Sequence, residues 1–172
     1  MAVDVFVSEE KIQKRVVELA EQINRDYAGK ELMIVGILNG AFMFCADLIR
    51  HIKVPVQLEF MSASSYGDGT ESSGNVKINM DVKKEMTGKH VLLIEDIVDT
   101  GLTLSSLMHL LEKRNPASLK LCSLLYKPAR IKHQVKIDYL AFEIEDHFVI
   151  GYGLDYAGAY RELPYIGIYK ND

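Results

Sequence analysis

The chain has 172 residues, of which 48% are hydrophobic and 26% are charged, and its formal net charge is −4. This length can bury a core without disulfides, and the composition is that of a globular protein rather than a disordered or fibrous one. The acidic net charge argues against a broad basic face for nucleic acid, and no segment approaches the ~20 uninterrupted apolar residues that span a bilayer.

The N-terminus and the two cysteines indicate the compartment. Residues 1–10 lack a basic region followed by a long apolar run, so we expect no secretory signal. Cys45 and Cys122 both lie in apolar contexts, which predicts two buried free thiols in a reducing environment. No cysteine and histidine stand at metal-ligand spacing. We therefore expect a cytoplasmic protein without a structural zinc and without membrane contact.

The first half of the chain alternates helices and strands. Ser8 predicts an N-cap, and Glu9 and Glu10 suit the positive first turn of the helix that follows. The apolar face of this helix and its end are marked by Ile12, Val16, Leu19, Ile23, Tyr27 and Gly29. The further elements are a strand over 31–38, a turn at Asn39-Gly40, a helix over 41–52 with Phe42 inward, a strand over 54–63, a polar loop over 64–75 and a strand over 76–81.

The second half continues the alternation. A buried strand over 90–95 precedes a helix over 103–114, which Asn115-Pro116 ends. Further strands are expected over 118–126, 138–144, 148–154 and 165–168. The pattern predicts an α/β fold, with a mostly parallel central sheet flanked by helices. We see no repeat, low-complexity tract or linker, and so expect a single domain over 1–172.

An acidic loop stands out, because ligands of such sheets bind beyond the carboxyl ends of the strands. The strand over 90–95 runs into Glu95 and Asp96, and Asp99 precedes the hydroxyl and glycine residues of 100–103. Unpaired N–H groups at a helix N-terminus favour phosphate, and sugar hydroxyls or a hard cation would satisfy the acids. The loop therefore predicts a sugar-phosphate site, with a plain helix cap bearing solvated acids as the alternative.

Asp99-Thr100-Gly101 also matches the short signature of the aspartic proteases. Those proteins are mainly β and need a second such motif or a dimer of smaller β chains. Here an amphipathic helix follows the motif at once, so we reject this interpretation.

Residues 91–101 resemble the phosphoribosyl-pyrophosphate signature of the type I phosphoribosyltransferase family, and the likeness extends over nearly the whole chain. Residues 64–67 resemble the start of the family's lid, and 123–128 the strand and lysine that meet a 6-oxopurine. Residues 142–156 with Tyr160-Arg161 resemble the purine hood. The set is similar to that of the hypoxanthine-guanine branch in bacteria. It implies the type I fold, with a core at about 8–135 and a hood formed by about 136–172 with the N-terminus.

The resemblance implies a purine-salvage reaction. Hypoxanthine or guanine and 5-phosphoribosyl 1-pyrophosphate would give IMP or GMP and pyrophosphate, with Mg²⁺ neutralising the leaving group. Two alternatives stay open: a sister enzyme favouring xanthine or guanine, and a regulator that senses the sugar pyrophosphate and binds nucleic acid. The acidic charge argues against the second. The apolar run Phe42-Met43-Phe44 suggests a subunit interface, and the family is commonly dimeric or tetrameric.

The resemblance also implies roles for individual residues. Asp99 would be the general base or hydrogen-bond partner of purine N7, and Lys127 would donate to O6. The complete assignments are Glu95, Asp96, Ile97, Val98, Asp99, Thr100, Gly101, Leu102 and Thr103 for ribose and its 5-phosphate; Asn39, Gly40 and Arg161 for pyrophosphate; Lys127, Phe148, Val149 and Asp155 for the purine; Glu95, Asp96 and Asp155 for Mg²⁺; and Ser65 and Tyr66 for the lid.

Without the family, the alternatives to these roles are a solvated strand end for Lys127 and core packing for Phe148. The lid is expected to be poorly ordered without ligands, and the Leu38–Asn39 peptide bond can be cis. The chain departs from the family at Asn39, where relatives often carry a basic residue, and at His147, where they often carry Lys or Glu.

Overall fold

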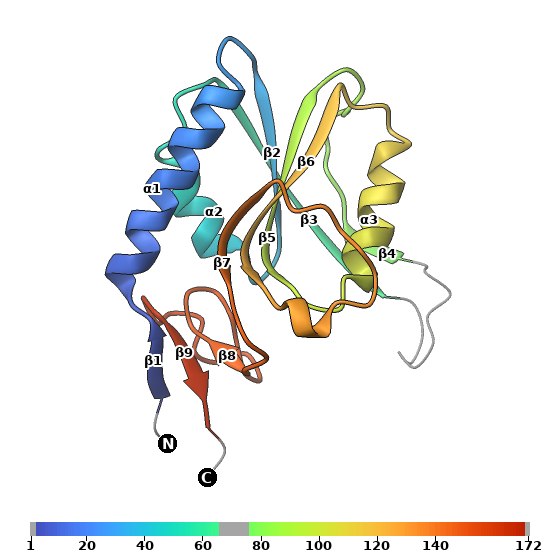
Figure 1. The fold of residues 1–172 in the computed structure, drawn as a ribbon. Helices are drawn as coiled ribbons and strands as arrows, with labels where there is room; N and C mark the ends of the chain where they lie inside the picture. The colour runs from blue at the N-terminus through green and yellow to red at the C-terminus, as the bar shows by residue number, and fades with distance from the viewer. Residues whose placement is uncertain (1–2, 66–75, 171–172) are drawn as a thin grey trace.

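The computed structural model describes residues 3–65 and 76–170, which form two sheets (Figure 1). The larger has the order β4-β3-β2-β5-β6-β7, and its neighbours are parallel except that β4 runs antiparallel to β3. Its strands are β2 (Leu32–Ile37), β3 (Val56–Ser65), β4 (Val76–Met80), β5 (His90–Val98), β6 (Ser118–Tyr126) and β7 (Tyr139–Glu143). The smaller, antiparallel sheet, which we call the hood sheet, contains β1 (Val3–Val7), β9 (Ile166–Tyr169) and β8 (Val149–Ile150) in that order.

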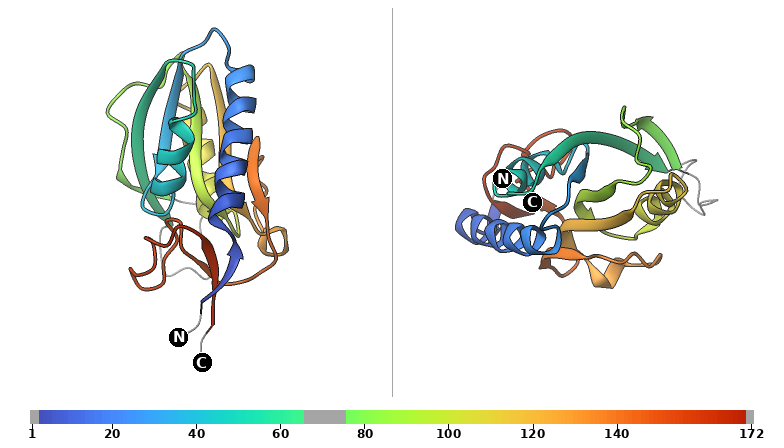
Figure 2. Two further views of the ribbon diagram at one scale, coloured as in Figure 1. Left: turned by 90° about the vertical axis from the view of Figure 1, so that its left-hand side faces the viewer. Right: turned by 90° about the horizontal axis from the view of Figure 1, so that it is seen from above.

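Helices cover both faces of the larger sheet (Figure 2). They are α1 (Glu9–Asp26), α2 (Phe42–Ile49) and α3 (Leu102–Glu112), with a 3₁₀ turn η1 (Pro128–Arg130). The helices α1 and α2 pack into one hydrophobic cluster and α3 into another, which confirms the predicted helix-flanked parallel sheet. The Ser8 cap is also confirmed, because its Oγ accepts from the Lys11 N–H at 3.3 Å. None of the described helices is long and apolar enough to cross a membrane.

Four expectations differ from the structure. Strand β5 continues past Glu95 to Val98, because this end still pairs with β6. Phe42 was expected inward but is 37% exposed. The expected strand over 148–154 stops at Ile150, because the next three residues all take positive φ. The hood does not begin near 136, because β7 pairs with β6 in the larger sheet. The N-terminal strand β1 was not anticipated.

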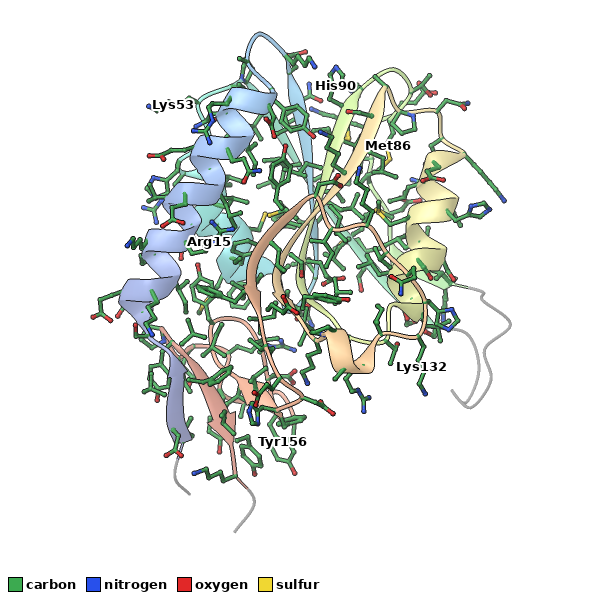
Figure 3. All side chains as sticks on the ribbon, viewed as in Figure 1. Arg15, Lys53, Met86, His90, Lys132 and Tyr156 are labelled. Carbon is green, nitrogen blue, oxygen red and sulfur yellow. The ribbon has the colours of Figure 1, made fainter. Side chains whose placement is uncertain are left out.

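The edge strand β7 and the hood sheet are both tied to the rest of the fold. Arg15 of α1 donates to the carbonyls of Leu140 and Ala141 at 2.6 and 3.1 Å, and Figure 3 shows its side chain between α1 and this strand. Buried residues of the hood sheet, such as Ile166, share one hydrophobic cluster with Ile12. The two sheets are therefore joined through shared buried residues.

Candidate functional site

The candidate residues gather at the carboxyl edge of three neighbouring parallel strands. Val98, Tyr126 and Glu143 stand side by side in β5, β6 and β7. Asp99 and Lys127 each follow the last paired residue of a strand, so the register alone makes them neighbours. The Lys127 N–H donates to the Val98 carbonyl at 3.0 Å, which extends the ladder by one step. Figure 1 shows η1 and the hood sheet at this same end of the molecule.

The loop between β5 and α3 lines a cavity of about 170 Å³, together with Ile37 of β2 and Ala63 of β3. Gly101 precedes the first residue of α3 with a φ of 82°, and a Cβ there would collide with the His133 carbonyl oxygen. Glycine is therefore required for both conformation and space. The residues of the predicted sugar-phosphate site that line the cavity are Glu95, Ile97, Val98, Asp99, Thr100, Gly101, Leu102 and Thr103. The cavity thus lies at a helix N-terminus, where N–H groups and the helix dipole favour an anion.

The two adjacent acids are held by backbone donors. The Asp96 N–H donates to Glu95 Oε1 at 3.0 Å, and the Ile97 N–H donates to Asp96 Oδ1 at 2.8 Å. Burial, and then the neighbouring charge of Asp96, raise the pKa of Glu95 well above its ordinary value. The free site therefore resists carrying both negative charges. A cation or a hydroxyl donor at this place would relieve that cost.

The turn after β2 lies against these acids. The Leu38–Asn39 peptide bond is cis, as the resemblance allowed. A Cβ at Gly40 would collide with the Asp96 carboxylate, and a Cβ at Gly153 would collide with the Gly40 carbonyl oxygen. The turn is thus packed between β5 and the segment after β8, and any side chain at either glycine would push these elements apart.

Arg161 and Asp155 join the same end of the site. Arg161 donates from Nη1 to the Gly153 carbonyl at 2.6 Å, and its Nη2 lies 3.3 Å from Asp155 Oδ1. The other oxygen of Asp155 accepts from the Gly158 N–H at 2.8 Å. The structure therefore brings Arg161 and Asp155 beside Gly153, which contacts the turn predicted to hold pyrophosphate.

The predicted purine residues differ in exposure. Lys127 is only 7% exposed, which excludes a solvated strand end, and its Nζ donates to Asp146 Oδ1 at 3.4 Å. Phe148 is 52% exposed, which excludes a core role. Val149 is buried and pairs with Ile168. Tyr156, an edge-on ring neighbour of Phe148, lies at the hood end of the molecule, opposite His90 (Figure 3).

Known proteins match this architecture along nearly its whole length. Residues 3–157 match the family model of the phosphoribosyl transferase domain. The chain belongs to the phosphoribosyltransferase family. The hypoxanthine phosphoribosyltransferase of Haemophilus influenzae is 48% identical to it, covering 96% of this chain and 94% of that protein. The hypoxanthine-guanine phosphoribosyltransferase of Dictyostelium discoideum is 51% identical, covering 100% and 98%.

The crystal structure of a hypoxanthine-guanine phosphoribosyltransferase from Bacillus anthracis agrees with the fold. Its TM-score is 0.93 at 47% identity, covering 97% of this chain and 98% of that one. These likenesses confirm the resemblance noted in the sequence and the type I phosphoribosyltransferase fold. The chain is an enzyme of the hypoxanthine-guanine branch, which transfers a pentosyl group.

The metal expected for a phosphoribosyltransferase would need ligands from the substrate. Within residues 3–65 and 76–170, no three His, Cys, Asp or Glu side chains gather closely enough to hold an ion. Mg²⁺ is commonly held by one or two carboxylates together with substrate phosphates. The adjacent carboxylates of Glu95 and Asp96 fit that kind of donor set, whereas Asp155, the third predicted ligand, is paired with Arg161.

Sequence reasoning gave no role to two charged residues of this edge. Arg130 ends η1 and donates from Nε to Asp99 Oδ1 at 3.0 Å, and Asp146 is the acceptor of Lys127. Ser65, at the end of β3, forms a hydroxyl contact with Thr103 in the first turn of α3. Tyr66 and the rest of the predicted lid, 66–75, lie outside the described residues.

Proposed function

We propose that this chain makes IMP and GMP from hypoxanthine and guanine, with 5-phosphoribosyl 1-pyrophosphate as the sugar donor. The observation that carries the proposal is the arrangement at the carboxyl edge of the sheet. Glu95 and Asp96 lie near the end of β5, Asp99 and a helix N-terminus follow it, and the buried Lys127 follows the adjacent strand β6. The printed names of the relatives, which are hypoxanthine or hypoxanthine-guanine phosphoribosyltransferases, support the same substrates.

The sugar donor would lie along the loop after β5. Its 5-phosphate would accept from the N–H and hydroxyl groups of 99–103, and its ring hydroxyls would donate to Glu95 and Asp96. Its pyrophosphate would lie between the Asn39-Gly40 turn and Arg161, whose guanidinium suits phosphate oxygens. The packing of Gly40 against Asp96 supports a single pocket for both ends of this substrate.

The purine would lie between the sugar and the hood. Phe148 offers an exposed ring for stacking, and Lys127 a buried ammonium for O6. Asp99 would take or share the N7 proton as N9 bonds to ribose C1 and the bond from C1 to pyrophosphate breaks. The backbone of Val149 and the carbonyl of Asp155 would read the ring edge, including the 2-amino group of guanine.

We also propose Mg²⁺ as the cofactor, with Glu95, Asp96 and Asp155 as its protein ligands. When bound, it would neutralise charge that develops on the departing pyrophosphate. The raised pKa of Glu95 supports this, because a nearby cation would stabilise the ionised carboxylate. Ser65 would begin a lid that excludes water, and its hydroxyl contact with Thr103 supports closure over residues 99–103, the proposed site of the 5-phosphate.

The same proposal includes the setting of the enzyme. We propose a cytoplasmic homodimer or homotetramer with no nucleic-acid partner. The two cysteines are free and buried, which suits a reducing compartment. Phe42 is an exposed aromatic residue at the start of α2, which suits a subunit interface.

The test is a Mg²⁺-dependent assay of 5-phosphoribosyl 1-pyrophosphate with hypoxanthine, guanine, xanthine and adenine. The wild-type protein should turn over hypoxanthine and guanine. Asp99→Asn should lower kcat at least about a hundredfold, since general acid–base groups contribute on this scale. Lys127→Ala should raise the KM for the base. No turnover with any of the four bases would reject the proposal, and xanthine as the best base would favour the sister enzyme.

A further inference from the structure

Four charged side chains alternate in sign across the carboxyl edge of the sheet. Arg130 Nε donates to Asp99 Oδ1 at 3.0 Å, and Arg130 Nη1 lies 3.9 Å from Asp146 Oδ2. Lys127 Nζ donates to the other oxygen of Asp146 at 3.4 Å. The four side chains thus form one series of ionic contacts. Asp99 and Lys127, the proposed partners of purine N7 and O6, are at its two ends. Arg130 and Asp146 are its inner links, and we call the four residues the charge chain.

The fold fixes the places of these residues. Asp99 and Lys127 follow Val98 and Tyr126, which are paired in register. A single 3₁₀ turn brings Arg130 back over the edge, because its N–H donates to the Lys127 carbonyl at 3.1 Å. Asp146 comes from the loop between β7 and β8. Three adjacent strands therefore each deliver part of the charge chain.

Stability alone does not account for the charge chain. Lys127 is buried, so its ammonium needs a counterion, which Asp146 provides. The side chains of Arg130 and Asp99 are 48% and 40% exposed, and ion pairs at such exposure add little to stability. The contact of the exposed Arg130 with Asp99 is better explained by the proposed role of Asp99 as the general base.

We propose that Asp146 and Arg130 are positioning residues that make the site selective for 6-oxopurines. Asp146 aims Lys127 at O6, and Arg130 orients the carboxylate of Asp99 toward N7. An ammonium has three N–H donors, so the bond to Asp146 leaves two for the base. In the same way, the contact of Arg130 with Oδ1 leaves Oδ2 of Asp99 for N7. The inference rests on the proposed function, since it names how that site selects its base.

The charge chain explains rejection of adenine as well as acceptance of hypoxanthine. A 6-amino group presents N–H donors where O6 presents an acceptor, and these donors would face the ammonium of Lys127. A site built around a hydrogen bond discriminates strongly only if its polar group cannot turn away. Asp146 holds that group in place, so its loss should weaken discrimination more than it weakens binding of the sugar donor.

The experiment compares Asp146→Asn with Glu145→Gln. Both remove one carboxylate charge from neighbouring residues, but Glu145 is 88% exposed and contacts His147 rather than Lys127. Affinities for IMP and AMP are measured by calorimetry, and the KM values of hypoxanthine and 5-phosphoribosyl 1-pyrophosphate by initial rates. Asp146→Asn should weaken IMP binding about tenfold, narrow the preference for IMP over AMP, and leave the KM of the sugar donor within about twofold. Glu145→Gln should match the wild-type protein, and Asp146→Glu should recover part of the loss.

The other link is tested separately with Arg130→Gln and Arg130→Lys. Arg130→Gln should lower kcat for hypoxanthine about tenfold with little change in the KM of the sugar donor, and Arg130→Lys should recover part of it. Lys136→Gln, which removes a cation that is 88% exposed and paired with Asp138, is the matched control and should change neither value. Melting temperatures close to that of the wild-type protein show that each variant is folded.

Two failures can be told apart. This inference alone would be overturned if the wild-type protein turns over hypoxanthine but neither variant behaves as expected. In that case Asp146→Asn keeps the preference for IMP over AMP, and Arg130→Gln keeps the kcat for hypoxanthine. A wild-type protein that neither turns over hypoxanthine nor prefers IMP to AMP would overturn the proposed function and this inference with it.

Discussion

At the residue scale, Glu95 is a carboxyl group directly beside a second acid, Asp96. Burial and the neighbouring Asp96 raise the pKa of its carboxyl well above 4.5. Between pH 4.5 and that raised value, the folded chain holds a proton that the unfolded chain has lost, so stability falls as pH rises through this window. We predict that Glu95→Gln raises the melting temperature of the ligand-free protein at about pH 8, and that the gain shrinks toward pH 4.5.

Thermal unfolding across this pH range measures the effect. Glu112→Gln, at the exposed end of α3, is the matched control and should follow the wild-type curve. The same Glu95→Gln protein should bind 5-phosphoribosyl 1-pyrophosphate more weakly, because the amide keeps the shape but loses the charge. If the difference in melting temperature between Glu95→Gln and the wild-type protein is the same at every pH, the proposed cause is contradicted.

At the scale of elements, the ring of Phe148 packs against other aromatic rings of the hood. Its ring lies edge-on to Tyr156 and Tyr169 at centroid distances of 5.8 and 5.9 Å, and those two rings stack at 4.4 Å. Such pairs contribute about 0.5–1.5 kcal/mol each, so we predict that Tyr169→Leu raises the KM of hypoxanthine about three- to tenfold. Tyr169→Phe keeps the ring and should recover part of the lost affinity for the base. Initial rates measure both, and an equal rise in the KM of the sugar donor would contradict a role confined to the base.

The sequence predicted the local elements but not the contacts between them. Period and capping predicted α1 with its Ser8 cap, and they predicted the buried strands, because each depends on residues close in the chain. The contacts of Asp99 with Arg130, and of Lys127 with Asp146, depend on parallel register and on one 3₁₀ turn. Spacing in the sequence does not encode these, so the acids of the loop were predicted but the charge chain was not.

At the scale of the whole molecule, the two sheets share their interior. Ile166 of β9 is fully buried in the cluster that also contains Ile12 of α1 and Leu92 of β5. The hood that carries Phe148 is therefore built on the same core as the sheet that carries Lys127. The base that we propose to bind between Phe148 and Lys127 would therefore contact two parts of the protein that share one hydrophobic cluster.

The cooperativity of unfolding between these two parts can be measured. We predict that Ile166→Ala destabilises the protein by about 2–5 kcal/mol, since it empties a buried site, and that unfolding remains a single transition. Val5→Ala, in the same sheet but 58% exposed, should change stability by no more than about 0.5 kcal/mol. Urea titrations followed by far-UV circular dichroism report the helices beside the larger sheet, and near-UV signals report the packing of the tyrosines, which include the pair stacked in the hood. Coincident curves mean that the hood is held by the shared core, whereas an earlier near-UV transition in Ile166→Ala would show a hood that loosens on its own.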